Sequence, residues 1–262
     1  MSVFGEKYSA YYDLFYANKD YTAEAAFLQN IIHRHKPDAR SILELGCGSG
    51  RHAVEFSKLG FRVTGIDRSE DMIKQGRQRI KEFSPEIRDR ITLNQGEATK
   101  FSTTEAHDVV VSLFHVVSYQ TTNDNLSGVF RSARAALVTG GLFTFDFWYG
   151  PGVMTERPLP RIKRLDISGV QLTRIAEPEH DVNRNVVQVK YTIFALDQSV
   201  NRIEQTIEVH SMRYLFLPEI ELLAAHHNFK IIEAGEWLTG KILHEHCWSG
   251  YVVAQAVPLA CC

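Results

Sequence analysis

The chain lacks the features of a secreted, membrane-spanning or nucleic-acid-binding protein. Its 262 residues include only four cysteines, two of them the last two residues, so we expect no disulfide framework. No apolar run approaches the ~20 residues of a membrane span, and the first residues contain no apolar core of a secretory signal. The 29 basic and 31 acidic residues leave a net charge of −2 without a basic stripe. We therefore expect a cytoplasmic protein that binds neither membranes nor nucleic acids.

Three glycines at two-residue spacing follow a short apolar run in residues 42–50, Ile-Leu-Glu-Leu-Gly-Cys-Gly-Ser-Gly. This pattern is typical of a strand that enters a tight turn before a helix. Because glycine tolerates positive φ and has no Cβ, such a turn can approach a ligand closely. A dinucleotide fingerprint would need a glycine at position 51, where the chain has Arg51. A ligand with a ribose and an amino-acid carboxylate fits the turn, and a glycine-rich turn of another α/β fold is the alternative.

The next predicted strand ends in an acidic residue, Asp67. It lies 21 residues after Gly46 (67 − 46). A carboxylate at this place can accept hydrogen bonds from both hydroxyl groups of a ribose. The alternative is an aspartate that caps a helix or forms a turn. Because Asp67 and the glycine turn both fit one binding geometry, we favour the ribose-binding role of Asp67.

Predicted strands and helices alternate as far as residue 148, which indicates a mostly parallel sheet with helices on both faces. Residues 150–216 predict an antiparallel β-lobe inserted after the fifth strand. Residues 1–149 and 217–262 then form one α/β domain, whose last strand is antiparallel. The predicted strands are 41–45, 62–66, 90–94, 108–113, 142–147, 161–167, 171–177, 186–195, 202–216, 230–236 and 250–257, and the predicted helices are 8–18, 22–35, 51–59, 70–82, 125–137 and 218–227.

These features resemble the class I S-adenosylmethionine-dependent methyltransferases, whose first motif looks like the segment from Glu44 to Gly50. The resemblance is greatest to the sugar N-methyltransferases of the desosamine and mycaminose N,N-dimethyltransferase type. Residues 11–14 with 19–21, 112–119 and 146–151 carry this likeness, which spans nearly the whole chain. It implies a Rossmann-like class I methyltransferase fold, S-adenosyl-L-methionine as cofactor and a small-molecule acceptor, with the amino group of a nucleotide-linked amino sugar as the leading candidate.

The resemblance also implies the positions of the cofactor contacts. Glu44 is expected near the ammonium group of the methionine part, and Asp67 at the ribose hydroxyls. The family has an acidic residue after the third strand that accepts from the adenine amino group. Here Glu97 is one methylene longer than the usual aspartate, so the backbone amide of Ala98 is an alternative contact. The other implied cofactor residues are Gly46, Cys47, Gly48, Arg68, Met72, Leu113 and Phe114, with Tyr12 and Tyr21 in an N-terminal arm.

An amine acceptor must lose a proton before it is methylated, and a hydroxyl acceptor needs a general base. His115 and Tyr119 follow the fourth strand, where such a group belongs, and Tyr12 is the third catalytic candidate. The resembled sugar enzymes have a histidine close to position 119, so the chain departs from them there. We expect three aromatic residues to wall the acceptor pocket: Trp148, Tyr149 and Trp248.

Several of these residues have structural alternatives. The aromatic residues between positions 11 and 16 form either a lid or a helix face packed on the core. His115 is alternatively a histidine with satisfied hydrogen bonds and no part in the chemistry. Residues 244–247, His-Glu-His-Cys, are spaced too tightly for the usual zinc patterns, so we expect a loop and no metal. Three further candidates have an alternative role in core packing: Cys47, Met72 and Phe114.

Two functional alternatives remain. The first is methylation of another small amine or hydroxyl, and the second is a cofactor-binding module without catalysis, because a fold alone does not establish chemistry. The β-lobe is a candidate surface for a homodimer, a candidate platform for the acceptor, or both.

Overall fold

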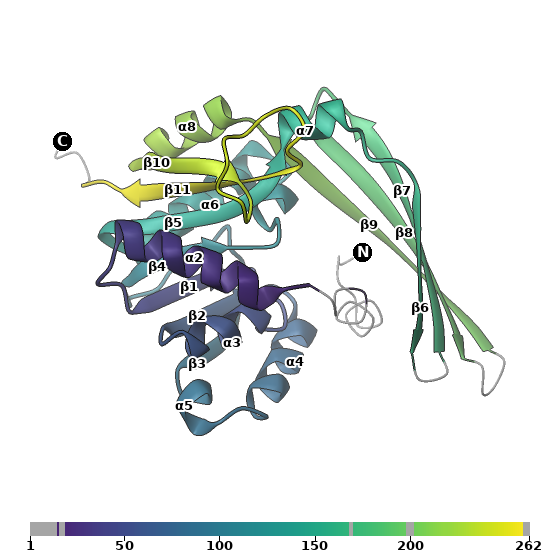
Figure 1. Ribbon diagram of the computed structural model, residues 1–262, viewed down its shortest axis with the longest axis horizontal. Coiled ribbons are helices and arrows are strands. Elements are labelled where there is room, and N and C mark those ends of the chain that lie inside the picture. Colours follow the sequence, from purple (N-terminus) through teal and green to yellow (C-terminus); the bar gives the residue numbers. More distant parts are fainter. Residues whose placement is uncertain (1–14, 16–18, 168–169, 198–201, 259–262) are drawn as a thin grey trace.

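The computed structural model describes Phe15 and residues 19–167, 170–197 and 202–258. The predicted helix over 8–18, including Tyr12, therefore lies outside the described residues except for Phe15. Strands and helices alternate through the first half of the chain, as predicted (Figure 1). The strands there are β1 (Ser41–Leu45), β2 (Arg62–Asp67), β3 (Ile91–Gln95), β4 (His107–Ser112) and β5 (Leu137–Tyr149), and the helices are α2 (Tyr21–His35), α3 (Arg51–Lys58), α4 (Glu70–Ile80), α5 (Pro85–Arg88), η1 (Val117–Tyr119) and α6 (Asn123–Ala136).

The five strands form a parallel sheet in the order β3-β2-β1-β4-β5. Beyond β5, strand β11 (Ser249–Ala256) pairs antiparallel with β5, and β10 (Phe229–Glu236) pairs antiparallel with β11. The predicted sheet, mostly parallel with an antiparallel last strand, is confirmed. The strand order reverses between β1 and β4, and open α/β sheets bind their ligands beyond the strand ends at such a point.

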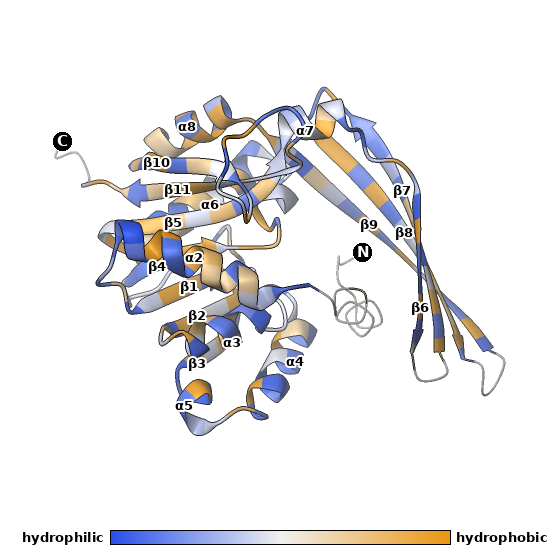
Figure 2. Cartoon of the chain, in the orientation of Figure 1, coloured by the Kyte–Doolittle hydropathy of each residue, from blue (hydrophilic) through white to orange (hydrophobic). Residues whose placement is uncertain are grey.

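Helices cover both faces of this sheet. Helices α2 and α3 pack on one face through residues such as Leu28 and Phe56, and α6 and α8 (Leu217–His226) pack on the other around Phe130. All five residues of β1 are buried, which is typical of a parallel strand covered on both faces. Figure 2 shows the central strands largely in hydrophobic colours, whereas colours alternate along the strands of the lobe. Within the described ranges, no helix combines the length and the apolar character that crossing a membrane requires.

The inserted β-lobe after the fifth strand is also confirmed. Strand β9 (Arg202–Leu215) pairs in parallel with the end of β5, through Trp148↔Tyr214 and Tyr149↔Leu215, so the lobe continues the central sheet (Figure 1). The division into domains at residues 150 and 216 stays a prediction, because this pairing joins both parts in one sheet. The lobe contains an unpredicted short helix, α7 (Gly150–Thr155), and the antiparallel strands β6 (Arg161–Ile167), β7 (Val170–Asp181), β8 (Val186–Asp197) and β9 (Arg202–Leu215).

Strand β7 is longer than predicted because a proline does not end it. The predicted strand ends at residue 177, directly before Pro178, and proline has no N–H to donate to a ladder. In the structure Pro178 lies opposite Val189 of β8, while β6 pairs with β7 only as far as Ala176. Beyond Ala176, β7 is therefore an edge strand, where a missing donor is tolerated.

Candidate active site

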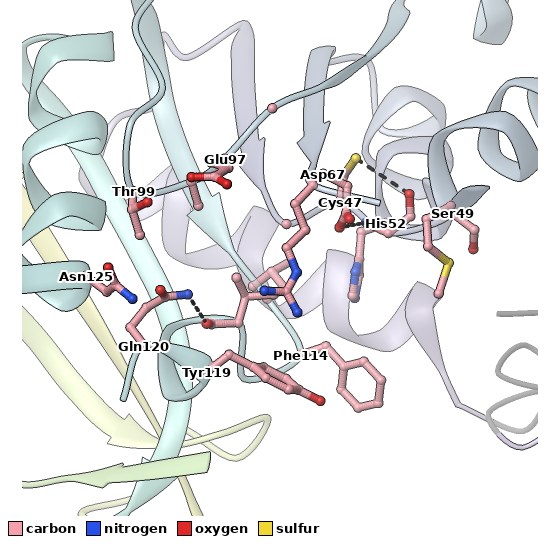
Figure 3. Close-up of a pocket in the computed structure, with 18 of the residues that line it drawn as sticks. Cys47, Ser49, His52, Asp67, Glu97, Thr99, Phe114, Tyr119, Gln120 and Asn125 are labelled. Carbon is pink, nitrogen blue, oxygen red and sulfur yellow. Dashed lines mark hydrogen bonds between the residues drawn. The ribbon is translucent and has the colours of Figure 1, made fainter. Parts of the chain in front are cut away.

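A cavity of about 380 Å³ opens at the C-terminal ends of the parallel strands. The glycine turn after β1 and the end of β2 form one side, and the segment after β4 and part of β9 form the other. Figure 3 shows Asp67 and His52 on one side of this space and Gln120 across from them. The cavity brings together twelve of the predicted site residues: Tyr21, Gly46, Cys47, Gly48, Asp67, Arg68, Met72, Glu97, Ala98, Leu113, Phe114 and Tyr119.

The glycine turn has a backbone conformation that favours glycine. The φ angles of Gly46, Gly48 and Gly50 are +81°, +52° and +71°. The N–H groups of Gly46 and Cys47 both donate to the carbonyl of Ile66, at 2.8 and 2.9 Å. A Cβ on Gly48 would meet no atom within 4 Å, so the backbone there faces open space. The turn therefore leaves room for a ligand beside Gly48, and its contact with the cofactor stays a prediction.

Asp67 ends β2 beside this turn. Its Oδ2 accepts a hydrogen bond from the N–H of Gly48 at 2.9 Å, and its Oδ1 accepts one from the N–H of Ser69 at 2.8 Å. Burial raises the pKa of the Asp67 carboxyl, while these two amide donors act in the opposite direction. A carboxylate has about four lone-pair sites, so both oxygens retain capacity to accept from the hydroxyls of a ribose.

A cluster of buried charged groups that the sequence analysis missed surrounds His52 in the cavity wall. Nε2 of His52 lies 2.6 Å from Oε2 of Glu24, and Nδ1 lies 3.4 Å from Oε1 of Glu44. Lys19 forms an ion pair with Glu24, and the indole N–H of Trp237 donates to Oε1 of Glu24 at 3.4 Å. Glu44 is 1% exposed and is not among the residues that line the cavity. Its contact with the cofactor's ammonium group stays a prediction.

Burial and pairing have opposite effects on the pKa values in this cluster. Burial raises the pKa of Glu44, and His52 offsets only part of that rise. Burial also acts to raise the pKa of Glu24, but His52 and Lys19 outweigh it and bring this pKa to about 2. Burial acts to lower the pKa of His52, but Glu24 and Glu44 outweigh it and raise the pKa. These directions favour a protonated His52 beside an ionised Glu24.

The adenine end of the predicted site combines buried and exposed residues. Met72 and Leu113 line the cavity at 3% and 2% exposure, so each of them also belongs to the core. Glu97 lines the cavity with a side chain that is 60% exposed and lies 3.8 Å from Lys100. The direct contact of Glu97 with adenine stays a prediction.

His115 follows β4 as predicted, and its imidazole contacts Asp146. Phe114 and His115 have φ angles of +61° and +62°, which is uncommon for residues with a Cβ. The backbone N–H of His115 donates to the carboxylate of Asp146 at 3.1 Å, and Nδ1 lies 2.7 Å from its Oδ2. His115 is not among the residues that line the cavity, so its role as a general base stays a prediction.

The three aromatic residues that we expected to wall the acceptor pocket do not line this cavity. The rings of Trp148 and Trp248 lie 5.5 Å apart and pack on a lobe cluster that includes Val187. Tyr149 packs beside Phe147, with ring centroids 6.3 Å apart. Their contact with the acceptor stays a prediction. Opposite the glycine turn, the cavity is lined by residues that the sequence did not lead us to expect: Gln120, Thr121, Asn125, Val209 and Ser211.

Residues 244–247 form a loop before β11, as expected. The Sγ of Cys247 accepts from the N–H of His244 at 3.4 Å, and Nδ1 of His246 lies 3.2 Å from Oε1 of Glu156. In the part of the chain that the structure describes, no three His, Cys, Asp or Glu side chains are arranged to hold a metal ion.

Comparison with known proteins supports a methyltransferase. Residues 42–141 match the methyltransferase domain family. The chain is 29% identical to the dTDP-3-amino-3,4,6-trideoxy-alpha-D-glucopyranose N,N-dimethyltransferase of Streptomyces venezuelae, over 70% of this chain and 74% of that protein. It is 24% identical to the dTDP-3-amino-3,6-dideoxy-alpha-D-glucopyranose N,N-dimethyltransferase of Streptomyces fradiae, over 74% of each. The crystal structure of Streptomyces venezuelae DesVI superposes with a TM-score of 0.78 at 24% identity and covers 98% of this chain and 100% of that one.

The sheet order, the glycine turn and the aspartate at the end of β2 define the class of this protein. It is a methyltransferase that uses S-adenosyl-L-methionine, and its sheet has the class I methyltransferase fold. Within this class, the similarity to enzymes that methylate amino sugars confirms the resemblance drawn from the sequence.

Replacing Asp67 is expected to weaken cofactor binding. Asp67→Asn removes the negative charge that would accept from the ribose hydroxyls, and a hydrogen bond to a charged group contributes ~1.5–3 kcal/mol, or roughly 10- to 150-fold in Kd. Titration of the folded variant with S-adenosylhomocysteine measures this loss. Glu70→Gln, an exposed change on the following helix, is the control. An unchanged Kd in Asp67→Asn would mean that the ribose is held elsewhere.

The buried glutamate of α2 is expected to make stability depend on pH. The pKa of Glu24 falls from 4.5 to about 2 on folding, so the unfolded chain binds more protons between these values. Stability from this group is complete above about pH 4.5 and is lost as the pH falls toward 2. Urea unfolding at about pH 6 and about pH 3.5 should show a smaller decrease for Glu24→Gln than for the wild type. Glu97→Gln should retain the wild-type decrease, and an equal decrease in Glu24→Gln would contradict the assignment.

Proposed function

We propose that this methyltransferase transfers the methyl group to the amino nitrogen of a nucleotide-linked amino sugar. The main support is the extent of its similarity to enzymes named for that reaction. The match to the Streptomyces venezuelae relative covers 185 residues, whereas the matched methyltransferase domain spans 100 (42 to 141). The likeness therefore extends beyond the segment that binds the cofactor.

The cavity suits such a reaction because it has two chemically different ends. One end contains the glycine turn and Asp67, and the other contains polar side chains such as Gln120 and Asn125 beside the lobe strand β9. Tyr119 lines the cavity together with these polar residues. The second end offers hydrogen-bonding groups for a polar acceptor.

S-adenosyl-L-methionine, when bound, supplies a methyl group already activated by the positive charge on sulfur. The protein then has to orient the acceptor nitrogen, exclude water and remove a proton from the ammonium form. Proximity and orientation can supply ~7–11 kcal/mol of such a barrier. An amine acceptor therefore needs less catalytic assistance from side chains than a hydroxyl, which requires a true general base.

The proposal predicts turnover with an amino sugar nucleotide. We expect S-adenosylhomocysteine to form when the protein is incubated with cofactor and dTDP-3-amino-3,4,6-trideoxy-alpha-D-glucopyranose, and the sugar to gain methyl groups on nitrogen. Mass spectrometry of both products measures the reaction. The matched control is the same nucleotide sugar with a hydroxyl in place of the amino group, which we expect to remain unmethylated.

Two other results would contradict the proposal in different ways. Turnover with free small amines or hydroxyl compounds, and none with any sugar nucleotide, would assign another acceptor class. Cofactor binding without turnover of any acceptor would indicate a binding module rather than an enzyme.

We also propose that the outer face of the lobe joins two copies of the chain. A row of residues in register crosses the lobe from Ile162 of β6 to Ile207 of β9, which are 57% and 48% exposed. Ile203 lies on the same face at 65% exposure. Exposed apolar surface of this kind marks interaction sites. The lack of nucleic-acid partners and a cytoplasmic location stay predictions from composition.

The dimer proposal predicts a mass of two chains in solution. Sedimentation equilibrium of the wild type should give a dimer, and Ile203→Lys should weaken it because it places a charge in the apolar face. Lys230→Ala, a change to an exposed charged residue of β10 outside the lobe, is the control. A monomeric wild type at micromolar concentration would contradict this proposal.

A further inference from the structure

Three side chains form a hydrogen-bonded line from the cavity wall into the β-lobe. Tyr119 lines the cavity, and its hydroxyl lies 2.8 Å from Nδ1 of His210 in β9. Nε2 of His210 lies 3.1 Å from Oε2 of Glu208, two residues earlier in the same strand. Tyr119 and His210 are 91 residues apart in the sequence. The line thus connects the cofactor-binding part of the chain to the inserted lobe.

The two lobe residues are almost completely withdrawn from solvent. His210 is 2% exposed and Glu208 is 9% exposed. As alternate residues of one strand they lie on the same face of the sheet. On β8, Tyr191 is paired with Glu208, and its ring centroid lies 5.0 Å from that of His210. Arg174 of β7 lies 5.0 Å over the Tyr191 ring. Among the described residues, Tyr119, Glu208 and Tyr191 are therefore titratable groups that face His210, and the charged Arg174 lies behind them over the Tyr191 ring.

The neighbours of His210 determine the role of each ring nitrogen. An ionised glutamate only accepts hydrogen bonds, so Nε2 carries the proton that faces Glu208. Nδ1 of the neutral ring then accepts from the hydroxyl of Tyr119. A phenolic oxygen that donates its own proton in this way can still accept one from another group. A hydroxyl, a base and a third group that orients the base are a common arrangement for activating a side chain.

We propose that His210, oriented by Glu208, is a positioning residue that makes Tyr119 a proton acceptor for the ammonium group of the methyl acceptor. This inference rests on the proposed function, because it requires an amine. One N–H bond of the ammonium breaks, and its proton passes to the oxygen of Tyr119 while the hydroxyl proton of Tyr119 passes to Nδ1 of His210. The nitrogen keeps the electron pair with which it forms the new bond to carbon. His210 becomes an imidazolium beside Glu208 and later releases its proton to solvent.

Turnover of variants tests the line directly, with dTDP-3-amino-3,4,6-trideoxy-alpha-D-glucopyranose as the acceptor. We expect His210→Gln to lower kcat about 100-fold, at the low end of the range for acid–base groups, with an unchanged Kd for S-adenosylhomocysteine. Tyr119→Phe should lower kcat by the same factor. The double variant should lower it no further, because both changes interrupt the same proton path. Glu208→Gln should lower kcat about tenfold, since it leaves Nδ1 intact. His180→Gln, a histidine elsewhere in the lobe, is the matched control and should leave kcat within about twofold.

The dependence of kcat on pH separates a proton acceptor from a structural residue. In the wild type, kcat should fall toward acid pH, because a protonated His210 cannot accept the proton. In His210→Gln this acid limb should be absent. A loss of activity by the same factor at every pH would overturn the proposal.

Nitrogen NMR of the imidazole, recorded without acceptor, keeps this inference separate from the proposed function. We expect His210 to be protonated at Nε2, with an Nδ1 resonance that shifts in Tyr119→Phe. Unchanged His210 resonances in Tyr119→Phe would overturn the line whatever the acceptor is. If the Nδ1 resonance shifts as expected but no sugar nucleotide is turned over, the proposed function is contradicted. The hydrogen-bonded line is then still supported.

Discussion

Three N–H groups of the glycine turn donate to the end of β2, and the rest of the site depends on this attachment. Gly46 and Cys47 share the carbonyl of Ile66, and Gly48 donates to the carboxylate of Asp67. Because β1 and β2 pair in parallel up to Leu45↔Ile66, the register of the sheet also sets the position of the turn. The Asp67 carboxylate, which we expect to bind the ribose, thus also holds the turn in place.

The buried ion pairs extend this arrangement to the first described helix. Charged groups withdrawn from water must be paired, and α2 supplies Glu24 to the His52 imidazole of α3. This contact fixes the start of α2 beside the cavity, where the ring of Tyr21 lies 4.8 Å from that of His52. The buried pair of Glu24 and His52 therefore places Tyr21 in the wall of the cavity.

The cofactor half of the site was predictable because its residues lie at strand ends. Alternating strands and helices imply a parallel sheet, and a parallel sheet brings residues such as Asp67 together at one edge. Glu24 could also have been found, because it lies on the helical stripe of Leu28 at i and i+4, and a charged residue on a buried stripe needs a partner. The contact between Tyr119 and His210 could not be predicted. It depends on strand β9 passing beside η1, which hydrophobic periodicity does not encode.

We propose that the turn after β1 and the end of β2 hold the methyl donor. A crystal structure of the protein with S-adenosylhomocysteine tests it most directly. We expect the nucleoside in the described cavity, with its ribose hydroxyls within hydrogen-bonding distance of the Asp67 carboxylate and its amino-acid part along Gly46 and Gly48. A ligand bound elsewhere, or a ribose held by other side chains while Asp67 bonds only its own backbone, would contradict it.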